Sequence, residues 1–370
     1  MKTKKGEMKI LHVITSLGIG GAEKLMVDML PRMRAMGHDV EALVFDGTPS
    51  SFMHSLESHG IVVHKLHAHG GIYTPTNVLR LVPYMRRYDV IHTHNTACQL
   101  YVPIARLLAW SGAKLVTTEH NTTNRRREMW YFKPIDRWMY ARYSQIISIS
   151  DKASMMLDNH IQPQGLTTIE NGIELENYFN AKPCERNLLV PEYAEGNVII
   201  AMVAGFREQK DHDCAIRALQ ELPGNYKLCL VGEGERRGEI ERFISELHLE
   251  NRVRLMGLRS DVPQILRASD VNLLASHWEG LSLSSVEGMA SGRPFIASDV
   301  NGLREVVSGH GLLFDDGDSH QLAEVIRRVT TDKAEYERVG KACALAARQY
   351  DIADTARKYC DVYEQICRKD

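Results

Sequence analysis

Residues 278–294 read Trp-Glu-Gly-Leu-Ser-Leu-Ser-Ser-Val-Glu-Gly-Met-Ala-Ser-Gly-Arg-Pro and place two glutamates, Glu279 and Glu287, eight positions apart. The first lies on a glycine-containing turn, and the second lies in an apolar-periodic run that predicts a helix beginning near Leu281. The N–H groups that would open this helix belong to Gly280, Leu281, Ser282 and Leu283. Unpaired N–H groups and the helix dipole favour a phosphate, and carboxylates accept hydrogen bonds from hydroxyls. Phosphate and hydroxyls side by side describe a nucleotide sugar.

The composition indicates a globular protein large enough for two domains. The chain has 370 residues, of which 44% are hydrophobic and 25% are charged. The net charge of −2 argues against a general nucleic-acid affinity. The first half is basic, however, with 20 Lys and Arg against 16 Asp and Glu in residues 1–180. Such a half can meet anionic phosphates or an anionic membrane surface, although ordinary surface variation explains the excess equally well.

The cysteines and the N-terminus favour a cytoplasmic location. Seven cysteines are scattered without any C-x-x-C pair, which predicts reduced thiols and no zinc site. No run of 18 apolar residues is present, so we expect no transmembrane helix. The opening Met-Lys-Thr-Lys-Lys leads into a short apolar run that is better interpreted as a first strand than as a signal peptide.

Short apolar runs alternate with helical periodicity along the chain, which predicts parallel βαβ units. In the first half we expect strands at 9–14, 40–45, 61–66, 90–93, 115–118 and 146–149, and helices near 22–33, 77–87 and 98–110. In the second half we expect strands at 198–204, 228–231, 253–256, 271–274 and 295–297, and helices near 211–222, 235–248, 262–268, 283–291 and from 319 onward. The periodicity lapses at 171–190, where we place a linker between domains 1–178 and 179–350.

The glutamate pair and the Met-Ala-Ser-Gly-Arg-Pro that follows it resemble the retaining GT-B glycosyltransferases of family 4, the glycosyl transferases group 1. The resemblance covers nearly the whole chain. It implies an α/β fold of two doubly wound Rossmann-like domains facing across a cleft, with the acceptor bound by the first domain and the nucleotide sugar by the second. It implies that a C-terminal helix at about 351–370 packs back on the first domain. Glu279 would contact the donor sugar, Glu287 the ribose, and the N–H groups of residues 280–283 the diphosphate.

A second matching segment is Val-Ala-Gly-Phe-Arg-Glu-Gln-Lys-Asp at residues 203–211. The family usually has an arginine five residues before the lysine, and both cations stabilise the leaving diphosphate. Here Lys210 is present, but Gly205 stands at the arginine position. Either Arg207 supplies the missing charge, or Lys210 acts alone. The difference matters, because electrostatic stabilisation of developing charge is often the largest catalytic contribution.

Glycines and histidines complete the resemblance. Gly20 and Gly21 lie in a loop that the family places by the diphosphate and the acceptor, and the dinucleotide fingerprint is not met because position 23 is a glutamate. Gly232 and Glu233 match a loop near the base and ribose. Of the histidines at predicted strand ends, His120 matches the family's histidine beside the donor sugar. We assign His94 to acceptor binding and expect His92 to point into the sheet.

Residues 125–138 combine cations with aromatic side chains. Arginines can grip an acceptor phosphate in a bidentate manner, which makes Arg125, Arg126 and Arg127 candidates for acceptor binding. Amphipathic aromatic and basic segments also lie in membrane interfaces. If a helix starts at Pro134, one face carries Ile135, Trp138, Met139 and Arg142, and that face could equally pack into the protein core.

The resulting expectation is a retaining transferase that moves a hexose-type sugar from a UDP- or GDP-sugar to a glycan or lipid-linked acceptor hydroxyl, in cell-surface polysaccharide or lipopolysaccharide synthesis. We expect it in the cytoplasm, with a peripheral position on the inner membrane as an option. No cofactor or metal is expected, and Asp315–Asp318 is interpreted as a helix-capping turn. The alternatives are a GT-B nucleotide-sugar epimerase, a non-catalytic nucleotide-sugar-binding partner of a biosynthetic complex and, more distantly, a dehydrogenase.

Overall fold

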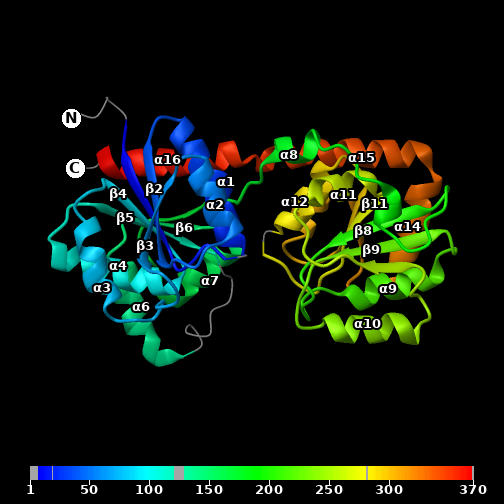
Figure 1. Ribbon diagram of the computed structural model, residues 1–370, viewed down its shortest axis with the longest axis horizontal. Coiled ribbons are helices and arrows are strands. Elements are labelled where there is room, and N and C mark those ends of the chain that lie inside the picture. Colours follow the sequence, from blue (N-terminus) through cyan, green and yellow to red (C-terminus); the bar gives the residue numbers. More distant parts are fainter. Residues whose placement is uncertain (1–6, 19, 121–128, 281, 369–370) are drawn as a thin grey trace. The chain divides into compact units, whose positions relative to one another are not determined.

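The computed structural model describes residues 7–18, 20–120, 129–280 and 282–368 (Figure 1). Contacts divide the chain into two compact units. The first unit comprises Met1–Gly172 and Ile352–Asp370, and the second comprises Ile173–Asp351. Each contains one parallel sheet with helices packed on it, so the predicted class of two parallel α/β domains is confirmed.

The first unit is built on a seven-stranded sheet. Its strands are β1 (Lys9–Ile14), β2 (Asp39–Asp46), β3 (Val62–His67), β4 (Val90–His94), β5 (Lys114–Glu119), β6 (Gln145–Ser148) and β7 (Leu166–Thr168). They pair in parallel in the order β3-β2-β1-β4-β5-β6-β7. The direction of strand addition reverses between β1 and β4, and ligands in such sheets bind beyond the carboxyl ends of the strands at this switch point.

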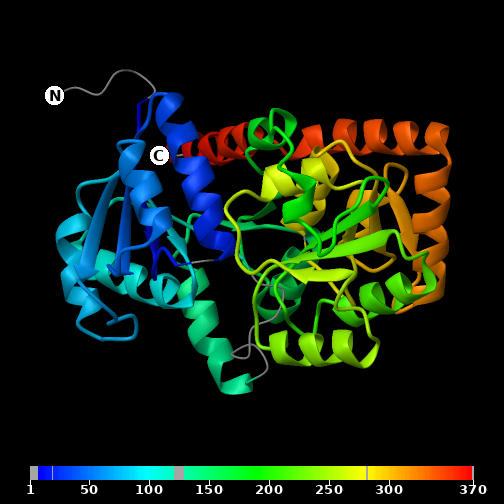
Figure 2. The ribbon, with the colours of Figure 1, turned by 45° about the vertical axis from the view of Figure 1, so that its right-hand side comes forward.

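Helices cover both faces of this sheet (Figure 2). One face packs against α1 (Gly21–Ala35), α2 (Ser51–Ser58) and α16 (Ile352–Arg368). The other packs against α3 (Asn77–Leu81), α4 (Thr96–Ala109), α6 (Lys133–Tyr140) and α7 (Asp151–Ile161). Single 3₁₀ turns follow α3 at η1 (Val82–Tyr84) and precede α6 at η2 (Trp130–Phe132). The C-terminal helix α16 therefore belongs to the first unit, where it lies beside α1.

The second unit has a six-stranded sheet. Its strands are β8 (Val198–Val203), β9 (Tyr226–Val231), β10 (Val253–Leu255), β11 (Val271–Leu274), β12 (Phe295–Ser298) and β13 (Leu312–Phe314). They pair in the order β10-β9-β8-β11-β12-β13, with the switch point between β8 and β11. The helices are α8 (Leu175–Phe179), α9 (His212–Glu221), α10 (Arg237–Glu246), α11 (Val262–Ala268), α12 (Leu283–Ala290), α13 (Arg304–Val307), α14 (Ser319–Thr331) and α15 (Lys333–Ala347), with 3₁₀ turns η3 (Arg186–Leu188) and η4 (Arg348–Tyr350).

The segment expected to be a linker is part of the second unit. Residues 175–179 form α8, and Leu175, Tyr178, Leu189 and Val190 are buried in the core of that unit. The division lies at 172/173, before the expected boundary at 178/179. Short helices and irregular backbone lack a sustained 3.6-residue period, although they bury apolar side chains just as well.

Two further expectations differ from the structure. The helix expected over 77–87 ends at Leu81 and continues as the 3₁₀ turn η1, because Pro83 has no N–H group to continue the helical ladder. Helices α2 and α7 and strands β7 and β13 were not expected from the sequence. Both missed helices begin with a serine cap, in which the Ser50 and Ser150 hydroxyls accept from N–H groups in the first turn.

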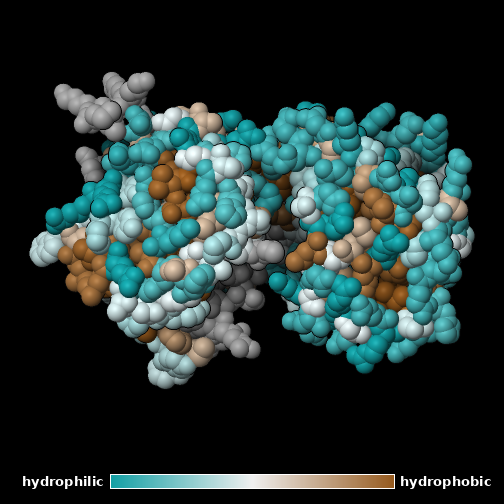
Figure 3. Space-filling view, viewed as in Figure 1, coloured by the Kyte–Doolittle hydropathy of each residue, from teal (hydrophilic) through white to brown (hydrophobic). Residues whose placement is uncertain are grey.

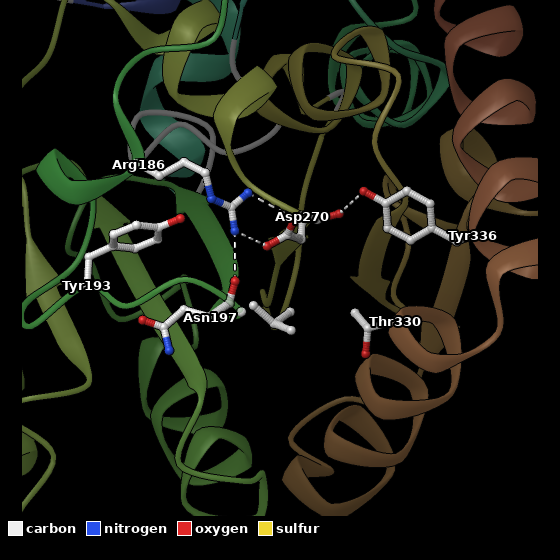
Figure 4. Close-up of a pocket in the computed structure, with 8 residues that line it drawn as sticks. Arg186, Tyr193, Asn197, Asp270, Thr330 and Tyr336 are labelled. Carbon is white, nitrogen blue, oxygen red and sulfur yellow. Dashed lines mark hydrogen bonds and ion pairs between the residues drawn. The ribbon is translucent and has the colours of Figure 1, made fainter.

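A cavity of about 320 Å³ opens at the amino ends of β8 and β11, and Figure 4 shows Arg186 and Asp270 at its centre. Arg186 donates to both Asp270 oxygens, at 2.7 and 3.0 Å, and also to the carbonyls of Asn197 and Ala268. Tyr336 donates to the Asp270 carbonyl. Arg186, Asp270 and Tyr336 are thus bonded to one another, and we call them the clasp, because they fasten the segment before β8 to the sheet.

If the clasp fastens this segment, removing its arginine should destabilise the protein. Replacing Arg186 by Met should lower the free energy of unfolding by about 2–4 kcal/mol, because a half-buried carboxylate and two carbonyls lose charged donors. The control is Arg259→Met, since Arg259 also forms a two-bond pair with an aspartate, Asp261, but only two residues away at the surface. Its loss should stay below about 1 kcal/mol. Equal losses in urea unfolding would contradict this account of the clasp.

Candidate functional site

Glu279 lies on the turn after β11 and keeps only 7% of its surface exposed. Lys210 Nζ forms an ion pair with its Oε1 atom, and Ser276 Oγ donates to the same oxygen at 2.7 Å. Gln209 Nε2 donates to Oε2 at 3.2 Å. A buried charge is costly unless it is paired and hydrogen-bonded, so Lys210 and Glu279 depend on each other. Because they come from different loops, their pairing links the turn after β11 to the loop after β8.

The sheet topology brings these two segments together. Parallel neighbours β8 and β11 end at the same edge, at the switch point of the second sheet. Backbone bonds then join the segments, from Asp211 N to Ala275 O at 3.1 Å and from His277 N to Gln209 O at 3.0 Å. The Asp211 side chain also caps α9 by accepting from Cys214 N. These two backbone bonds, together with the side-chain bonds from Gln209 and Ser276 to Glu279, hold the Lys210–Glu279 pair in place.

Helix α12 follows the turn and begins at Leu283, in agreement with the helix expected near 283–291 and two residues after the start suggested near Leu281. Its N-cap Ser282 makes no side-chain cap, so no side chain at that position competes for the first N–H groups of the helix. Gly280 precedes the helix, and Leu281 lies outside the described residues. Glu287 is half-buried in the second turn of α12. The arrangement places a helix start without a side-chain cap next to the Glu279 turn.

Two glycines allow the backbone to approach closely at this edge. Gly302 has φ +90°, and an added Cβ would lie 2.1 Å from Gly280 O and 2.6 Å from Glu279 O. At Gly232, with φ +150°, the added Cβ would lie 2.0 Å from Ala204 O. Neither position has room for a side chain. Gly302 therefore permits the position of the Glu279 turn, and Gly232 permits the close approach of the two backbone segments that follow β8 and β9.

Arg207 is exposed, and its side chain lies beside the glycine that stands at the family's arginine position. Its Nε atom is 3.7 Å from the point where a Cβ of residue 205 would sit. The space where a side chain at Gly205 would begin is therefore next to the Arg207 guanidinium. This geometry favours the alternative in which Arg207 supplies the second positive charge.

Gly232 and Glu233 follow β9. Gly232 N donates to Gly257 O at 3.0 Å, and Phe206 N donates to the Glu233 carbonyl at 3.0 Å. The Glu233 carboxylate pairs with Arg237 in the first turn of α10. The loop is thus attached to the same edge as Lys210, with a carboxylate that already has a cationic partner.

In the first unit, Gly20 and Gly21 form the start of α1. Gly20 is the N-cap residue in an extended conformation and makes no side-chain cap, and Gly21 is the first helical residue. Glu23 lies in the first turn, and its Oε2 atom would be 2.2 Å from a Cβ at position 20. A larger residue at position 20 would therefore have to displace that flexible side chain.

His120 directly follows β5 and is partly exposed, whereas His94 at the end of β4 is fully buried. His94 Nδ1 lies 2.9 Å from His120 Nε2, and its other nitrogen lies 3.0 Å from His12 Nδ1. Both nitrogens of His94 are used inside the protein, so direct acceptor contact, which we expected for it, is not available in this structure. His92 is fully buried within the sheet, as expected. Burial lowers the pKa of His120 to about 4, so its ring is neutral near pH 7.

The aromatic and basic segment is described from Met129 onward, and Arg125, Arg126 and Arg127 lie outside the described residues. Trp130 and Tyr131 are exposed by 85% and 52%, respectively. The expected common face on α6 is divided, because Met139 is buried in the core while Ile135 and Trp138 stay exposed. The guanidinium of Arg142 lies over the Trp138 ring, 4.6 Å from its centroid.

Two groups of side chains have the spacing of metal ligands within the described part of the chain. Asp211, His277 and Asp316 form one, but Asp211 caps α9 and His277 pairs with Asp316 at 2.9 Å. Histidines 12, 92 and 94 form the other, and every ring nitrogen among them already has a protein partner. The turn at 315–318 caps α14 through Asp318, which accepts from Gln321 N at 2.9 Å, as expected.

Comparisons with known proteins agree with this architecture. The sequence family described as Glycosyl transferases group 1 matches residues 190–344, and Glycosyltransferase Family 4 matches residues 19–177. The Escherichia coli UDP-Gal:alpha-D-GlcNAc-diphosphoundecaprenol alpha-1,3-galactosyltransferase is 27% identical over 264 residues, which are 67% of this chain and 67% of that protein. The lipopolysaccharide core biosynthesis glycosyltransferase LpsD of Rhizobium meliloti is 33% identical over 199 residues, 52% of this chain and 57% of that protein. The crystal structure of Anabaena HepE in complex with UDP and glucose has the same fold, with a TM-score of 0.82 and 23% identity over 97% of this chain and 100% of that one.

The close contact of Gly302 with the Glu279 turn predicts how a side chain at position 302 would change stability. Gly302→Ala should lower the free energy of unfolding by about 2–5 kcal/mol, since it adds a backbone clash to the cost of a positive φ. Gly309→Ala is the matched control, because Gly309 has φ +79° with no atom within 4 Å of an added Cβ. The control should lose only about 1–2 kcal/mol. If chemical denaturation gives the same loss for both variants, the turn is not fixed by this contact.

Proposed function

The chain belongs to the glycosyltransferases of family 4, group 1, and on that premise we propose that it moves a hexose from a nucleotide diphosphate sugar to an acceptor hydroxyl with retention of the anomeric configuration. The second unit would bind the donor. The observation that carries this proposal is the buried Lys210–Glu279 pair beside the start of α12. It puts a cation, a carboxylate and uncapped N–H groups on one edge of a sheet, which is what a diphosphate and a sugar require.

The two charges have separate parts in the reaction. As the bond to the sugar breaks, negative charge develops on the leaving diphosphate, and Lys210 would stabilise it. Glu279 would accept hydrogen bonds from sugar hydroxyls. Its Oε1 atom already accepts from Lys210 and Ser276, whereas Oε2 accepts from Gln209 alone among the described residues, which leaves it a further lone pair for a sugar hydroxyl. Glu287, one turn into α12, would hold the ribose.

We propose that no metal is required, because protein groups can neutralise the diphosphate. Lys210 supplies one positive charge, and the Arg207 guanidinium next to Gly205 supplies a second. The partly exposed His120 would contact the donor sugar from the first unit. Among the groups assigned here none is a free carboxylate suited to attack the sugar, so we favour attack on the same face with the leaving phosphate accepting the acceptor proton.

The acceptor that fits best is lipid-linked or anionic and lies at an anionic membrane surface. Trp130, Tyr131 and Trp138 expose aromatic rings next to Lys133 and Arg137, a combination suited to the headgroup region. Figure 3 shows apolar side chains on the surfaces of both units among mostly hydrophilic ones. In the described residues, no helix is long and apolar enough to cross a membrane. The E. coli relative named above acts on a diphosphoundecaprenol-linked sugar, which is consistent with a lipid-linked acceptor in cell-surface glycan synthesis on the cytoplasmic side.

The donor is tested by thermal shift with UDP-, GDP- and ADP-sugars, because a ligand that binds the native state stabilises it by about 2.7 kcal/mol at 100 times its Kd. We expect stabilisation by one base class in the wild type, and its loss in Glu287→Ala, which removes the ribose partner. A shift that is identical in the variant would remove Glu287 from the ribose site. No shift with any donor would favour a non-catalytic partner of a complex.

The role of the cations is tested by transfer kinetics with the donor so identified. Lys210→Met should lower kcat by about 10²–10³, as for loss of one donor to a developing negative charge. Arg207→Ala should lower it by about tenfold or more, and Arg242→Ala, an exposed arginine on α10, should leave it unchanged. Full activity of Arg207→Ala would show that Lys210 acts alone. Turnover of the donor to another nucleotide sugar without an acceptor would indicate an epimerase.

Membrane contact is tested by co-sedimentation with vesicles containing anionic lipid. The double variant Trp130→Ala/Tyr131→Ala should bind at least tenfold more weakly, because two exposed interfacial aromatic rings are lost. Trp110→Ala is the control, since Trp110 is 88% exposed at the end of α4. Equal binding by all three proteins would remove the membrane from the proposal.

A further inference from the structure

A continuous chain of hydrogen bonds runs from His120 into the core of the first unit. His120 Nε2 lies 2.9 Å from His94 Nδ1, and His94 Nε2 lies 3.0 Å from His12 Nδ1. These residues come from the ends of β5 and β4 and from the middle of β1. Polar rings of this kind are unusual inside a parallel sheet, whose strands are normally apolar on both faces.

The chain continues through helix α16. His12 Nε2 lies 3.5 Å from the hydroxyl of Tyr363, which lies 2.6 Å from His92 Nδ1. The last two links join His92 Nε2 to Thr118 Oγ1 at 2.8 Å and Thr118 Oγ1 to the Tyr359 hydroxyl at 3.1 Å. Apart from the outer end, His120, all of these residues are buried.

All four histidines are neutral near pH 7. Burial lowers the pKa of His12 to about 3 and that of His120 to about 4, and it lowers the pKa values of His92 and His94 well below the ordinary range. A neutral imidazole carries one proton, so it donates from one nitrogen and accepts at the other. The direction of a bond therefore passes unchanged through each histidine. At the Tyr363 and Thr118 hydroxyls it passes on only if the hydroxyl donates its own proton within the chain, because a hydroxyl that accepts from both neighbours leaves its buried proton without an acceptor.

Two arrangements run continuously through every link, and they leave His120 in different tautomers. If the bonds run inward, His120 carries its proton on Nε2 and donates to His94. If they run outward, Tyr359 donates to Thr118, Thr118 to His92, His92 to Tyr363, Tyr363 to His12, His12 to His94 and His94 to His120. His120 then carries its proton on Nδ1.

The inner end of the chain selects the outward direction. In the inward direction Thr118 would donate to Tyr359, and the Tyr359 hydroxyl proton would have no acceptor among the described residues, where Thr118 is the one partner of that hydroxyl. A buried donor without an acceptor is costly, and such groups are rare in native proteins. In the outward direction every proton inside the chain has a partner, and the one proton left over, on Nδ1, belongs to the partly exposed His120 at the outer end.

We infer that Tyr363, His92, His12 and His94 act as positioning residues that hold His120 as the Nδ1–H tautomer. This inference rests on the proposed function for its consequence, which is that His120 presents a hydrogen-bond donor, not a base, to an oxygen of the donor sugar. It also makes the C-terminal helix α16 part of the machinery that sets the chemistry of the first unit.

The test is the tautomer of His120, read from long-range ¹H–¹⁵N correlations of ¹⁵N-histidine-labelled full-length protein without any ligand, with His120→Gln to assign the signals. In the wild type, we expect one set of His120 signals with the proton on Nδ1. Tyr363→Phe keeps the ring but cuts the link between His92 and His12, so signals of the Nε2–H tautomer should appear beside the first set. Thr118→Val removes the group that selects the direction, and it should have the same effect.

Tyr143→Phe is the matched control. Tyr143 is a buried tyrosine of the same unit that bonds to Thr93 and Gln99 instead of this chain. It loses a buried hydroxyl in the same way, but His120 should keep a single tautomer. Circular dichroism of each variant establishes that it is folded. If Tyr363→Phe does not fold, Thr118→Val provides the test.

Three results would overturn the inference. They are a wild-type His120 protonated mainly on Nε2, an unchanged tautomer in both folded variants, and a stoichiometric transition metal bound at His12, His92 and His94 in the purified protein. Because the spectra need no donor, failure of the donor screen leaves this outcome unaffected. Once a donor is known, a variant that populates both tautomers equally should bind that donor roughly twofold more weakly, because about half of its molecules are in the competent state.

Discussion

The ion pair between Lys210 and Glu279 is the contact on which the site of the second unit depends. It joins two loops that are far apart in sequence and that leave adjacent strands, β8 and β11. Both charges are largely removed from water, and Ser276 and Gln209 satisfy further lone pairs of the carboxylate. Such a pair contributes little net stability, because desolvation offsets much of the attraction. It does fix where a cation and a carboxylate lie before a ligand arrives, and that preorganisation is what electrostatic catalysis requires.

Parallel sheets explain why the polar groups gather where they do. Strands covered on both faces leave little room for polar side chains except at their ends, and the widest opening lies where the strand order reverses. In the second unit the switch point lies between β8 and β11, where the pair lies. In the first unit it lies between β1 and β4, and His94 ends the second of these strands. The buried His12 and His92 are exceptions to the apolar rule. Tyr363 of α16 forms hydrogen bonds with both rings, which offsets the cost of burying them.

Much of this could be predicted from the sequence. The helix α1 and the strand β11 were correctly expected. Burial of one face gives a helix apolar residues every 3.6 positions, and burial of a strand gives a short apolar run, so both patterns are visible in the sequence. Residues 278–294 and 203–211 led to the turn, the helix and the lysine that the structure brings together. The sequence left the start of α12 between Leu281 and Leu283, and the structure has Leu283, since helix ends depend on caps and not on periodicity.

Other features could not be predicted, because they depend on contacts between distant segments. Nothing in the local sequence links Gly302 to Glu279, or Tyr363 to His12. His94 looked accessible at a strand end, yet its ring is covered and both its nitrogens are used. The missed helix α2 buries only Met53 and Leu56, too few apolar side chains for a periodic signal, and its serine cap was the available clue.

The most direct test of the central claim compares the affinities of a nucleotide diphosphate and of its sugar conjugate for the wild type and for Glu279→Gln, by titration calorimetry. If Glu279 holds the sugar while Lys210 faces the phosphates, the variant keeps its affinity for the nucleotide diphosphate, or gains some because Lys210 loses its competing partner. Its affinity for the nucleotide sugar should fall about tenfold or more, the effect of losing charged hydrogen bonds to hydroxyls. Equal losses for both ligands, or no loss for either, would contradict the account.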